Sequence, residues 1–548
     1  MHFIKKKSFI NSLSVIERRR FLKTLGVILS SPIISPALRF ALGDQFGGEL
    51  YAQGISKVSN FIEINLRDTW HWGHCFQSPT LARQISNGSV PINNSRTQSF
   101  FQSGLAYYHG SRGLTDAGNN LYLTPDSIAL RAHANNIAVF EMNEPVGGPQ
   151  GGRGTTHGHE ASNPARIPGR NLFNRANNGQ MPVWINDIGD PGNGTPQGNI
   201  RAYADTPSLD CFHNHTLRSA GVARVNGLVF KGISRGHDCY HFDYNLKQGK
   251  MTNVNSFGAL LQRFPNSTQD LNLLKSANER EAVLKAVKSL DESYFKDRNV
   301  TRNSVEKYLA QVDGSKNDLY DPQNTKTIDL RLSNQERDFW SQGVPAQNQG
   351  NGDNQGRVKM NIWEQVAYAY KLISSGRVKT ISMEFDYIDV HHNIQRNELT
   401  TMARQVSLPL ARLIQKLKED NIFDDTVIQI NSLDGSRHPR AFSYSATNGN
   451  DGSYYGLNTS VVAGGKVRGG YYGDIKYENN RYNLYNPNFS TGAVDRSGYR
   501  PTIQNYNRFI RGGILWKTIA RGMGMPTSSY NGFNSLRNLP YLDFLFRS

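Results

Sequence analysis

The chain has 548 residues, of which 37% are hydrophobic and 20% charged, and it contains 51 glycines. This composition predicts a globular protein long enough for one large α/β domain with insertions or for two domains, and no internal apolar run is long enough to predict a membrane span. Residues 1–42 contribute +7 of the formal net charge of +17, and the positive residues of the remainder are scattered rather than gathered in blocks, which argues against nucleic-acid binding.

Residues 1–45 are predicted to be a twin-arginine signal peptide. The sequence ERRRFLK at residues 17–23 combines paired arginines with Phe-Leu-Lys and precedes a mostly apolar segment, which is the twin-arginine export pattern. The alternative is an ordinary basic amphipathic helix, but Pro32 and Pro36 would break it. We therefore expect export through the twin-arginine translocon to the periplasm or the medium, and a single mature domain at residues 55–548.

The first convincing strand is NFIEINL at residues 60–66, and it ends in the polar segment RDTWHWGH at 67–74. A second buried strand, IAVFEM at 137–142, precedes the glycine-rich loop GGPQGGRGTTHGHE at 147–160. This loop lacks the Lys-Ser/Thr of a P-loop and does not match a dinucleotide fingerprint. It offers hydroxyls, imidazoles and a carboxylate beside flexible backbone, although a loop that only turns the chain is the alternative.

Short strands are predicted at residues 181–185 and 227–233. Residues 267–345 differ in kind, because they are charged, rich in Leu, Lys, Glu and Ala, and apolar at helical spacing. We interpret them as a helical insertion into the domain. A further helix is predicted over 361–375.

The central unit of the sequence, residues 378–435, is predicted to form strand, turn, helix, strand and turn. The helix spans 399–417, and Pro409 inside it is expected to kink or split it. The second strand, at 426–430, is β-branched, as in a buried parallel sheet. A strand-helix-strand crossover places both turns at the same edge of the sheet, where α/β proteins bind ligands.

The two turns of this unit carry residue types that bind divalent metals. They are Asp386, Asp389, His391, His392 and Asp434. The alternative is that these residues only cap helices or line exposed turns.

The last third of the chain is predicted to contain a strand at 459–463 and a closing helix at 514–523. Between them, residues 464–501 are dense in Tyr, Asn and Gly. We expect an irregular hairpin packed on the core there, although a face that stacks sugars is the alternative.

The order of these motifs resembles the bacterial family called domain of unknown function 1501 (DUF1501), which is related to the alkaline phosphatase and sulfatase superfamily. The resemblance is strongest over residues 382–473 and leaves out the helical insertion. The matching motifs are Leu66-Arg67, Thr156-His157, Asp389-Val390-His391 with Gln395, Ser432, and AGGKVRGG at 463–470.

This resemblance implies an α/β fold like that of alkaline phosphatases and sulfatases, with a mostly parallel sheet flanked by helices. In that superfamily, strand-end carboxylates and histidines hold one or two divalent metals, and a hydroxyl or modified cysteine attacks phosphorus or sulfur. This sequence departs from the family pattern in three places. The acid after Leu-Arg is either displaced to Asp68 or replaced by His71, the acidic position after Ser432 holds Leu433 with Asp434 one place later, and no histidine stands beside Asp451. These departures leave open a site with one metal or none.

Two functional hypotheses follow. The first is an exported metal-dependent hydrolase of phosphate or sulfate esters, acting on an anionic small molecule or polysaccharide with Zn, Ca or Mg. Its catalytic residues would be Thr156 or Thr155 as nucleophile, His157, and Arg67 or Arg153 to neutralise the anion. Its metal ligands would be Asp389, His391, Asp434, Asp68 and His71. The second is a non-catalytic envelope protein of the same fold that binds a glycan or a protein partner.

Overall fold

The computed structural model describes the central sheet, the helices that flank it and a hairpin. The described residues are 60–66, 75–90, 113–141, 208–219, 222–223, 226–230, 251–263, 330–346, 360–376, 378–385, 396–432, 459–478, 481–496, 510, 512–530, 536 and 539–547. The predicted signal peptide, the predicted strand at 181–185 and most of the predicted helical insertion lie outside these residues.

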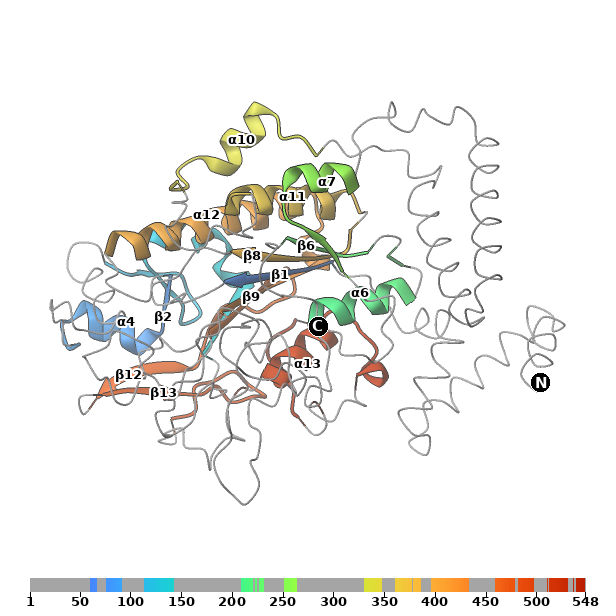
Figure 1. Ribbon diagram of the computed structural model, residues 1–548. Coiled ribbons are helices and arrows are strands. Elements are labelled where there is room, and N and C mark those ends of the chain that lie inside the picture. Colours follow the sequence, from blue (N-terminus) through green and yellow to red (C-terminus); the bar gives the residue numbers. More distant parts are fainter. Residues whose placement is uncertain are drawn as a thin grey trace, which may run out of the picture.

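The described residues form one large sheet of eight strands in the order β11-β5-β10-β9-β1-β8-β6-β7 (Figure 1). Neighbouring strands pair in parallel except at β10, which runs antiparallel to both β5 and β9. This confirms the predicted α/β class and the mostly parallel sheet. The strands are β1 (Asn60–Leu66), β5 (Ile137–Glu141), β6 (Leu228–Phe230), β7 (Thr252–Val254), β8 (Thr380–Phe385), β9 (Thr426–Ser432), β10 (Thr459–Gly464) and β11 (Gly470–Tyr472).

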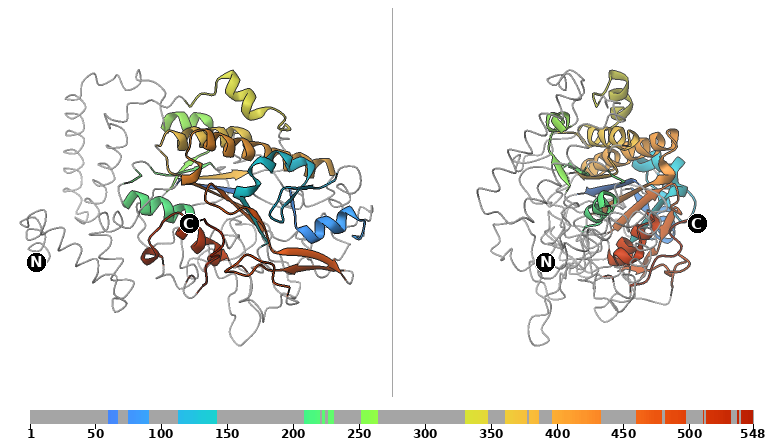
Figure 2. Two further views of the ribbon diagram at one scale, coloured as in Figure 1. Left: turned by 180° about the vertical axis from the view of Figure 1, so that it is seen from behind. Right: turned by 90° about the vertical axis from the view of Figure 1, so that its right-hand side faces the viewer.

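Helices α11 (Ile362–Ser374) and α12 (Arg396–Glu419) cover one face of this sheet, and α6 (Leu209–Ser219) and α13 (Gly512–Gly522) cover the other (Figures 1 and 2). On the α11 and α12 side, Ile62, Ile64 and Leu66 of β1 join the larger apolar core. On the α6 and α13 side, a second core gathers aromatic rings, with the Phe212 and Trp516 centroids 5.0 Å apart. The result is a three-layer arrangement of helices, sheet and helices.

Helix α12 is the helix expected at 399–417, and its apolar residues at three- and four-residue steps are buried. Pro409 lies inside α12, yet the helix continues as one element to Glu419, so the expectation that it might split is wrong. Proline removes one backbone hydrogen bond. Val406, Leu410 and Leu413 are buried on either side of it, and this packing offsets the local loss.

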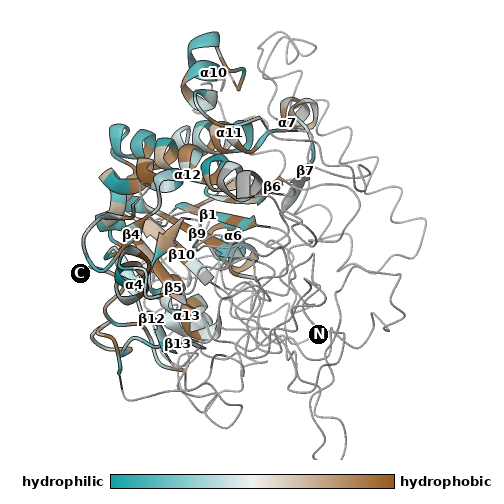
Figure 3. Cartoon of the chain, turned by 90° about the vertical axis from the view of Figure 1, so that its left-hand side faces the viewer, coloured by the Kyte–Doolittle hydropathy of each residue, from teal (hydrophilic) through white to brown (hydrophobic). Residues whose placement is uncertain are grey.

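Helix α10 (Asn334–Ser341) is the described end of the predicted helical insertion, and it packs over α11 and α12. It begins with a capping box, in which Ser333 Oγ accepts a hydrogen bond from the Glu336 backbone N–H at 3.2 Å. Trp340 is the buried residue of this helix, and Figure 3 shows α10 as mostly hydrophilic beside the hydrophobic strands of the sheet.

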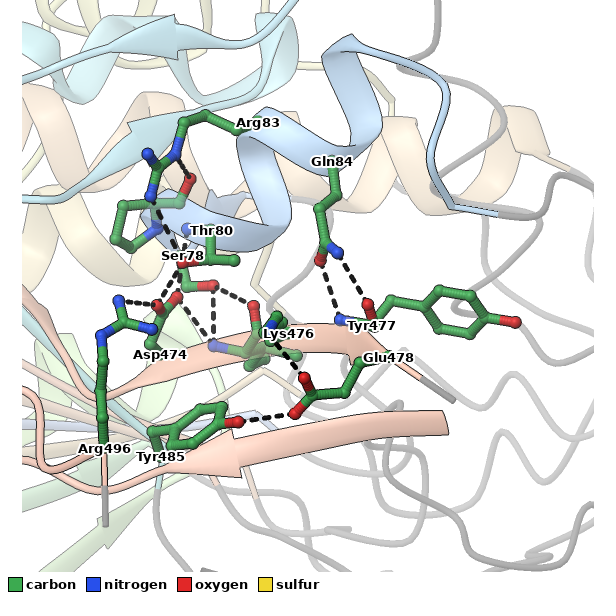
Figure 4. A network of polar contacts seen from close by, with 12 residues as sticks. Ser78, Thr80, Arg83, Gln84, Asp474, Lys476, Tyr477, Glu478, Tyr485 and Arg496 are labelled. Carbon is green, nitrogen blue, oxygen red and sulfur yellow. Dashed lines mark hydrogen bonds and ion pairs between the residues drawn. The ribbon is translucent and has the colours of Figure 1, made fainter. Parts of the chain in front are cut away.

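The hairpin expected within residues 464–501 is confirmed as β12 (Asp474–Glu478) and β13 (Arg481–Tyr485), which pair antiparallel. A helix that the sequence did not suggest, α4 (Pro79–Ser86), docks on β12. Leu81 and Ile85 of α4 pack with Ile475 of β12 in a small apolar cluster, and polar contacts add to this docking (Figure 4). Asp474 accepts from the Thr80 backbone N–H at 3.1 Å, and the Gln84 amide pairs with the backbone N–H and C=O of Tyr477 at 2.8 and 2.7 Å.

The smaller elements complete the described parts of the chain. They are β2 (Phe76–Gln77), β3 (Thr115–Asp116), β4 (Tyr122–Leu123), the 3-10 helix η2 (Pro125–Asn136), α7 (Phe257–Arg263), η7 (Phe423–Asp425) and η9 (Thr527–Ser529). Among the described residues, no helix combines the length and apolar character needed to cross a bilayer.

Candidate functional site

The central strands β9, β1 and β8 end together at one edge of the sheet. Leu66 of β1 lies opposite Phe385 of β8 on one side and opposite Ser432 of β9 on the other. The three strands run in parallel, so these residues mark their carboxyl ends. This is the edge at which α/β sheets bind ligands.

The segments that follow these three strand ends carry most of the predicted site. Arg67, Asp68 and His71 come after β1, Asp389 and His391 after β8, and Asp434 after β9. These residues, together with Thr155, Thr156 and His157, lie outside the described residues, so their arrangement stays a prediction. Within the described ranges, no group of three or more His, Cys, Asp and Glu side chains is placed to hold a metal ion.

The structure adds a row of buried polar side chains on one face of the same strands. The row faces α6 and α13, and each of its members is at most 1% exposed. Side chains alternate between the two faces of a strand, so the opposite face of β1 stays apolar. The members are Glu63 and Asn65 of β1, Ser382 and Glu384 of β8, Gln429 and Asn431 of β9, and Ser460 of β10.

The Glu63 carboxyl group is the centre of this row. Its Oε2 accepts hydrogen bonds from Ser382 Oγ at 2.8 Å and from Asn65 Nδ2 at 3.0 Å. Its Oε1 lies 3.5 Å from Asn431 Nδ2, so all three central strands contribute donors to one carboxyl group. A buried carboxyl group is tolerated only with such partners, because desolvation of its charged form is costly.

The row continues across β9 to β10. Asn431 Oδ1 accepts from Gln429 Nε2 at 3.0 Å and from Ser460 Oγ at 3.2 Å. Gln429 Oε1 is buried and has no hydrogen-bond partner among the described residues. Sequence reasoning missed the row. The sequence does contain a signal for it, because each of the three central strands has two polar residues, separated by one residue, within an otherwise apolar run.

A second polar cluster lies at the opposite, amino-terminal end of the strands. His213 of α6 places its ring Nδ1 2.7 Å from Thr380 Oγ1, at the start of β8. The neighbouring Asn214 accepts a hydrogen bond from the Gly227 backbone N–H at 2.9 Å. These contacts attach α6 to the sheet. Their position, away from the carboxyl ends, favours a structural role for His213.

Cys75 and Cys211 are buried free thiols. Burial, with a smaller contribution from Asp126, raises the pKa of the Cys75 thiol well above its usual value. A thiol with a raised pKa is a poor nucleophile. Cys75 is therefore a poor candidate for a nucleophile.

Comparison with known protein families gives a match over part of the chain. The model of the family described as "Protein of unknown function (DUF1501)" matches residues 260–489. The match supports the resemblance found in the sequence, and it also covers residues 267–345, which that resemblance did not reach. The front motifs Leu66-Arg67 and Thr156-His157 lie outside it. No curated protein and no solved structure matches the chain.

Proposed function

From the similarity to DUF1501 over residues 260–489 and the coincident ends of β1, β8 and β9, we propose that this chain is an exported, metal-dependent hydrolase of phosphate or sulfate esters. The observation that carries the proposal is the register of the three central strands. The relation to alkaline phosphatases and sulfatases, and export by the twin-arginine route to the periplasm or medium, are parts of the same proposal.

The register matters because it limits where the following residues can lie. Neighbouring strands are about 4.8 Å apart, and a residue adds at most about 3.6 Å of chain. Asp68 and Asp434 each come two residues after a strand end, and Asp389 comes four residues after one. These acids are therefore all within reach of one point above the sheet edge.

The donor set at these positions, carboxylates with imidazoles, is of the kind that binds Zn, and its oxygens also suit Ca or Mg. Such a metal, when bound, would neutralise charge on the transferred group and lower the pKa of a nucleophile. In this proposal Asp389, His391 and Asp434 hold the metal, with Asp68 or His71 completing its ligands. Thr156 or Thr155 attacks the ester, His157 assists it, and Arg67 faces the anion.

The buried polar row supplies fixed support beneath this edge. Asn65 and Glu384 each stand one residue before the end of their strand. Dipoles held rigidly by hydrogen bonds keep neighbouring charges in place at little cost during a reaction. The row therefore fits a strand edge that carries charged groups.

The proposal is tested by elemental analysis and ester hydrolysis on protein exported by its native route. We expect a stoichiometric divalent metal and hydrolysis of p-nitrophenyl phosphate or sulfate. The double variant Asp389→Ala, His391→Ala should lose the metal and at least about 100-fold of the rate, because metal-assisted stabilisation is worth several kcal/mol. Asp116→Ala, which removes an exposed acid on β3, is the matched control and should retain both.

Wild-type protein with neither metal nor hydrolysis would overturn the proposal. The alternative, a non-catalytic envelope protein that binds a glycan or a partner, would then take its place.

A further inference from the structure

A polar cavity of about 550 Å³ lies beside β11, at the edge of the described sheet. Its walls include Asn119, Asn120, Arg468, Tyr472 and Arg547. Among the described residues, the lining therefore carries two guanidinium groups and no carboxylate. A volume of this size holds a small-molecule ligand, and the positive lining selects one with negative charge.

The two arginines are brought together by a short antiparallel contact between distant segments. Val467 and Phe546 form an isolated β-bridge, and Arg468 N donates to Leu545 O at 2.8 Å while Arg547 N donates to Lys466 O at 2.8 Å. Arg468 thus lies opposite Leu545, and Arg547 comes two residues after Leu545 on the same strand. The two arginines are therefore diagonal neighbours on one face of the bridge. Diagonal neighbours of this kind lie about 7–8 Å apart, a spacing that one anion can bridge with long side chains.

Both guanidinium groups have donors to offer. Arg547 Nη2 donates to the Asn135 carbonyl at 2.8 Å, which anchors the side chain and leaves its other N–H groups available. Arg468 is exposed, and its guanidinium has no hydrogen bond or ion pair to any residue in the described part of the chain. A fork of N–H donors without an acid partner is the group that recognises sulfate, phosphate or carboxylate.

Tyr472 interacts with both arginines. Its hydroxyl donates to the Arg468 carbonyl at 2.8 Å. Burial raises the pKa of Tyr472 to about 12, and Arg468 and Arg547 both act in the opposite direction through their charge. Each guanidinium is therefore close enough for its field to reach the same phenol, which remains neutral at ordinary pH.

A turn that carries two amides forms another part of the cavity wall. Asn119 and Asn120 have φ of 51° and 63°, a left-handed conformation that asparagine tolerates. The Asn119 carbonyl accepts from Tyr471 N at 3.1 Å, and a Cβ at Gly470 would approach the same oxygen at 2.7 Å. The left-handed backbone conformation explains why asparagine occupies both positions. The turn also places two side-chain amides, which pair well with hydroxyls, in the wall of the cavity.

The cavity is separate from the strand ends of the proposed active site. β11 is three strands away from β9 in the sheet, which is roughly 14 Å at about 4.8 Å a strand. Close approaches of the backbone explain three glycines of the motif at 463–470. A Cβ at Gly464 would crowd the Thr426 carbonyl, one at Gly465 would collide with Asp424, and one at Gly469, next to Arg468, would collide with the Ala134 carbonyl.

We propose that this cavity binds a carbohydrate that carries an oxyanion, namely a sulfate, phosphate or carboxylate group. Arg468 and Arg547 hold the oxyanion, and Asn119 and Asn120 hydrogen-bond to sugar hydroxyls. The inference goes beyond ester hydrolysis, because binding here needs neither a metal nor a reaction.

The test is calorimetric titration of the mature chain with glucose 6-phosphate and glucose 6-sulfate, beside glucose and inorganic phosphate. We expect each anionic sugar to bind more tightly than glucose and more tightly than phosphate. Arg468→Gln and Arg547→Gln should each weaken binding about tenfold, the usual effect of losing a charge-assisted hydrogen bond. Lys466 belongs to the same bridge but is not among the described residues that line the cavity. Lys466→Gln removes one positive charge there and should weaken binding less than threefold.

The proposal would be overturned by no binding of either anionic sugar, by a loss in Lys466→Gln equal to that in the arginine variants, or by equal affinity for inorganic phosphate and sugar phosphate. The double variant Asp389→Ala, His391→Ala should bind the sugars unchanged. Binding lost in that variant but kept in Arg468→Gln would place the ligand at the strand ends and would also contradict the proposal.

Discussion

Among single residues, Glu63 shows how a side chain within a correctly predicted strand can still be misread. The sequence NFIEINL predicts β1 with its observed bounds, because its apolar residues suit a buried strand. It does not reveal that Glu63 and Asn65 share a face with polar residues of β8 and β9. That fact depends on register between segments more than 300 residues apart, which local patterns do not contain.

The hydrogen bond from Ser382 to Glu63 should contribute measurably to stability. Ser382→Ala removes a donor from a fully buried carboxyl group, and we expect the free energy of unfolding to fall by about 1–3 kcal/mol. Ser374→Ala, at an exposed position of α11, should change it by less than about 0.5 kcal/mol. Urea denaturation of the mature chain measures both. Equal effects would mean that the row is not a stabilising network.

His133 should make the protein less stable in acid. Burial, followed by the charge of Lys418, lowers the pKa of His133 from 6.5 to about 4 in the folded chain. Between pH 6.5 and 4 the unfolded chain therefore binds a proton that the folded chain does not, so stability falls as the pH falls. Thermal melting at pH 7 and pH 4.5 should show a smaller acid loss in His133→Gln than in the wild type. The same loss in both would contradict this assignment.

At the scale of elements, the docking of α4 on β12 depends on one buried carboxylate. Asp474 is fully buried and accepts from Thr80 and Ile475 backbone N–H groups, while its ion-pair partner Arg496 is half exposed, at 3.0 Å. The sequence predicted the hairpin but not this helix, because PTLARQIS is short and amphipathic over barely two turns. Its place is set by tertiary contacts, both the polar ones and those of Leu81 and Ile85 with Ile475, which a pattern of two turns does not reveal.

Asp474 and Arg496 should contribute unequally to the stability of the folded chain. Asp474→Ala leaves buried donors without an acceptor, so we expect a loss of about 2–4 kcal/mol in the free energy of unfolding and faster hydrogen exchange in α4. Arg496→Gln removes only a solvent-screened partner and should cost no more than about 1 kcal/mol. Similar losses in the two variants would show that the charge pair, rather than the backbone contacts, holds α4.

At the scale of the whole molecule, sequence patterns predict the α/β class, the parallel character of the sheet and the helices α11, α12 and α13. They do not predict the order of the strands. The unit β8-α12-β9 suggests adjacent strands, whereas β1 lies between them and pairs with both. Strand order is decided by which faces pack against which helices, over distances that a local pattern does not span. The arrangement of the candidate site is likewise not predicted by local patterns. Its residues follow β1, β8 and β9, which are brought together only by the order of the strands in the sheet.

The central position of β1 has a consequence for synthesis. β1 ends at Leu66, but its partners begin at Thr380 and Thr426, so it has no neighbour in the sheet until most of the chain has left the ribosome. At about 5–20 residues per second, that interval is roughly 15–60 s. During this interval β1, which is mostly apolar, has no partner strand and is prone to aggregation. A nascent chain stopped before Thr380 should therefore need a chaperone, and its β1 should become resistant to protease only once β9 has been made.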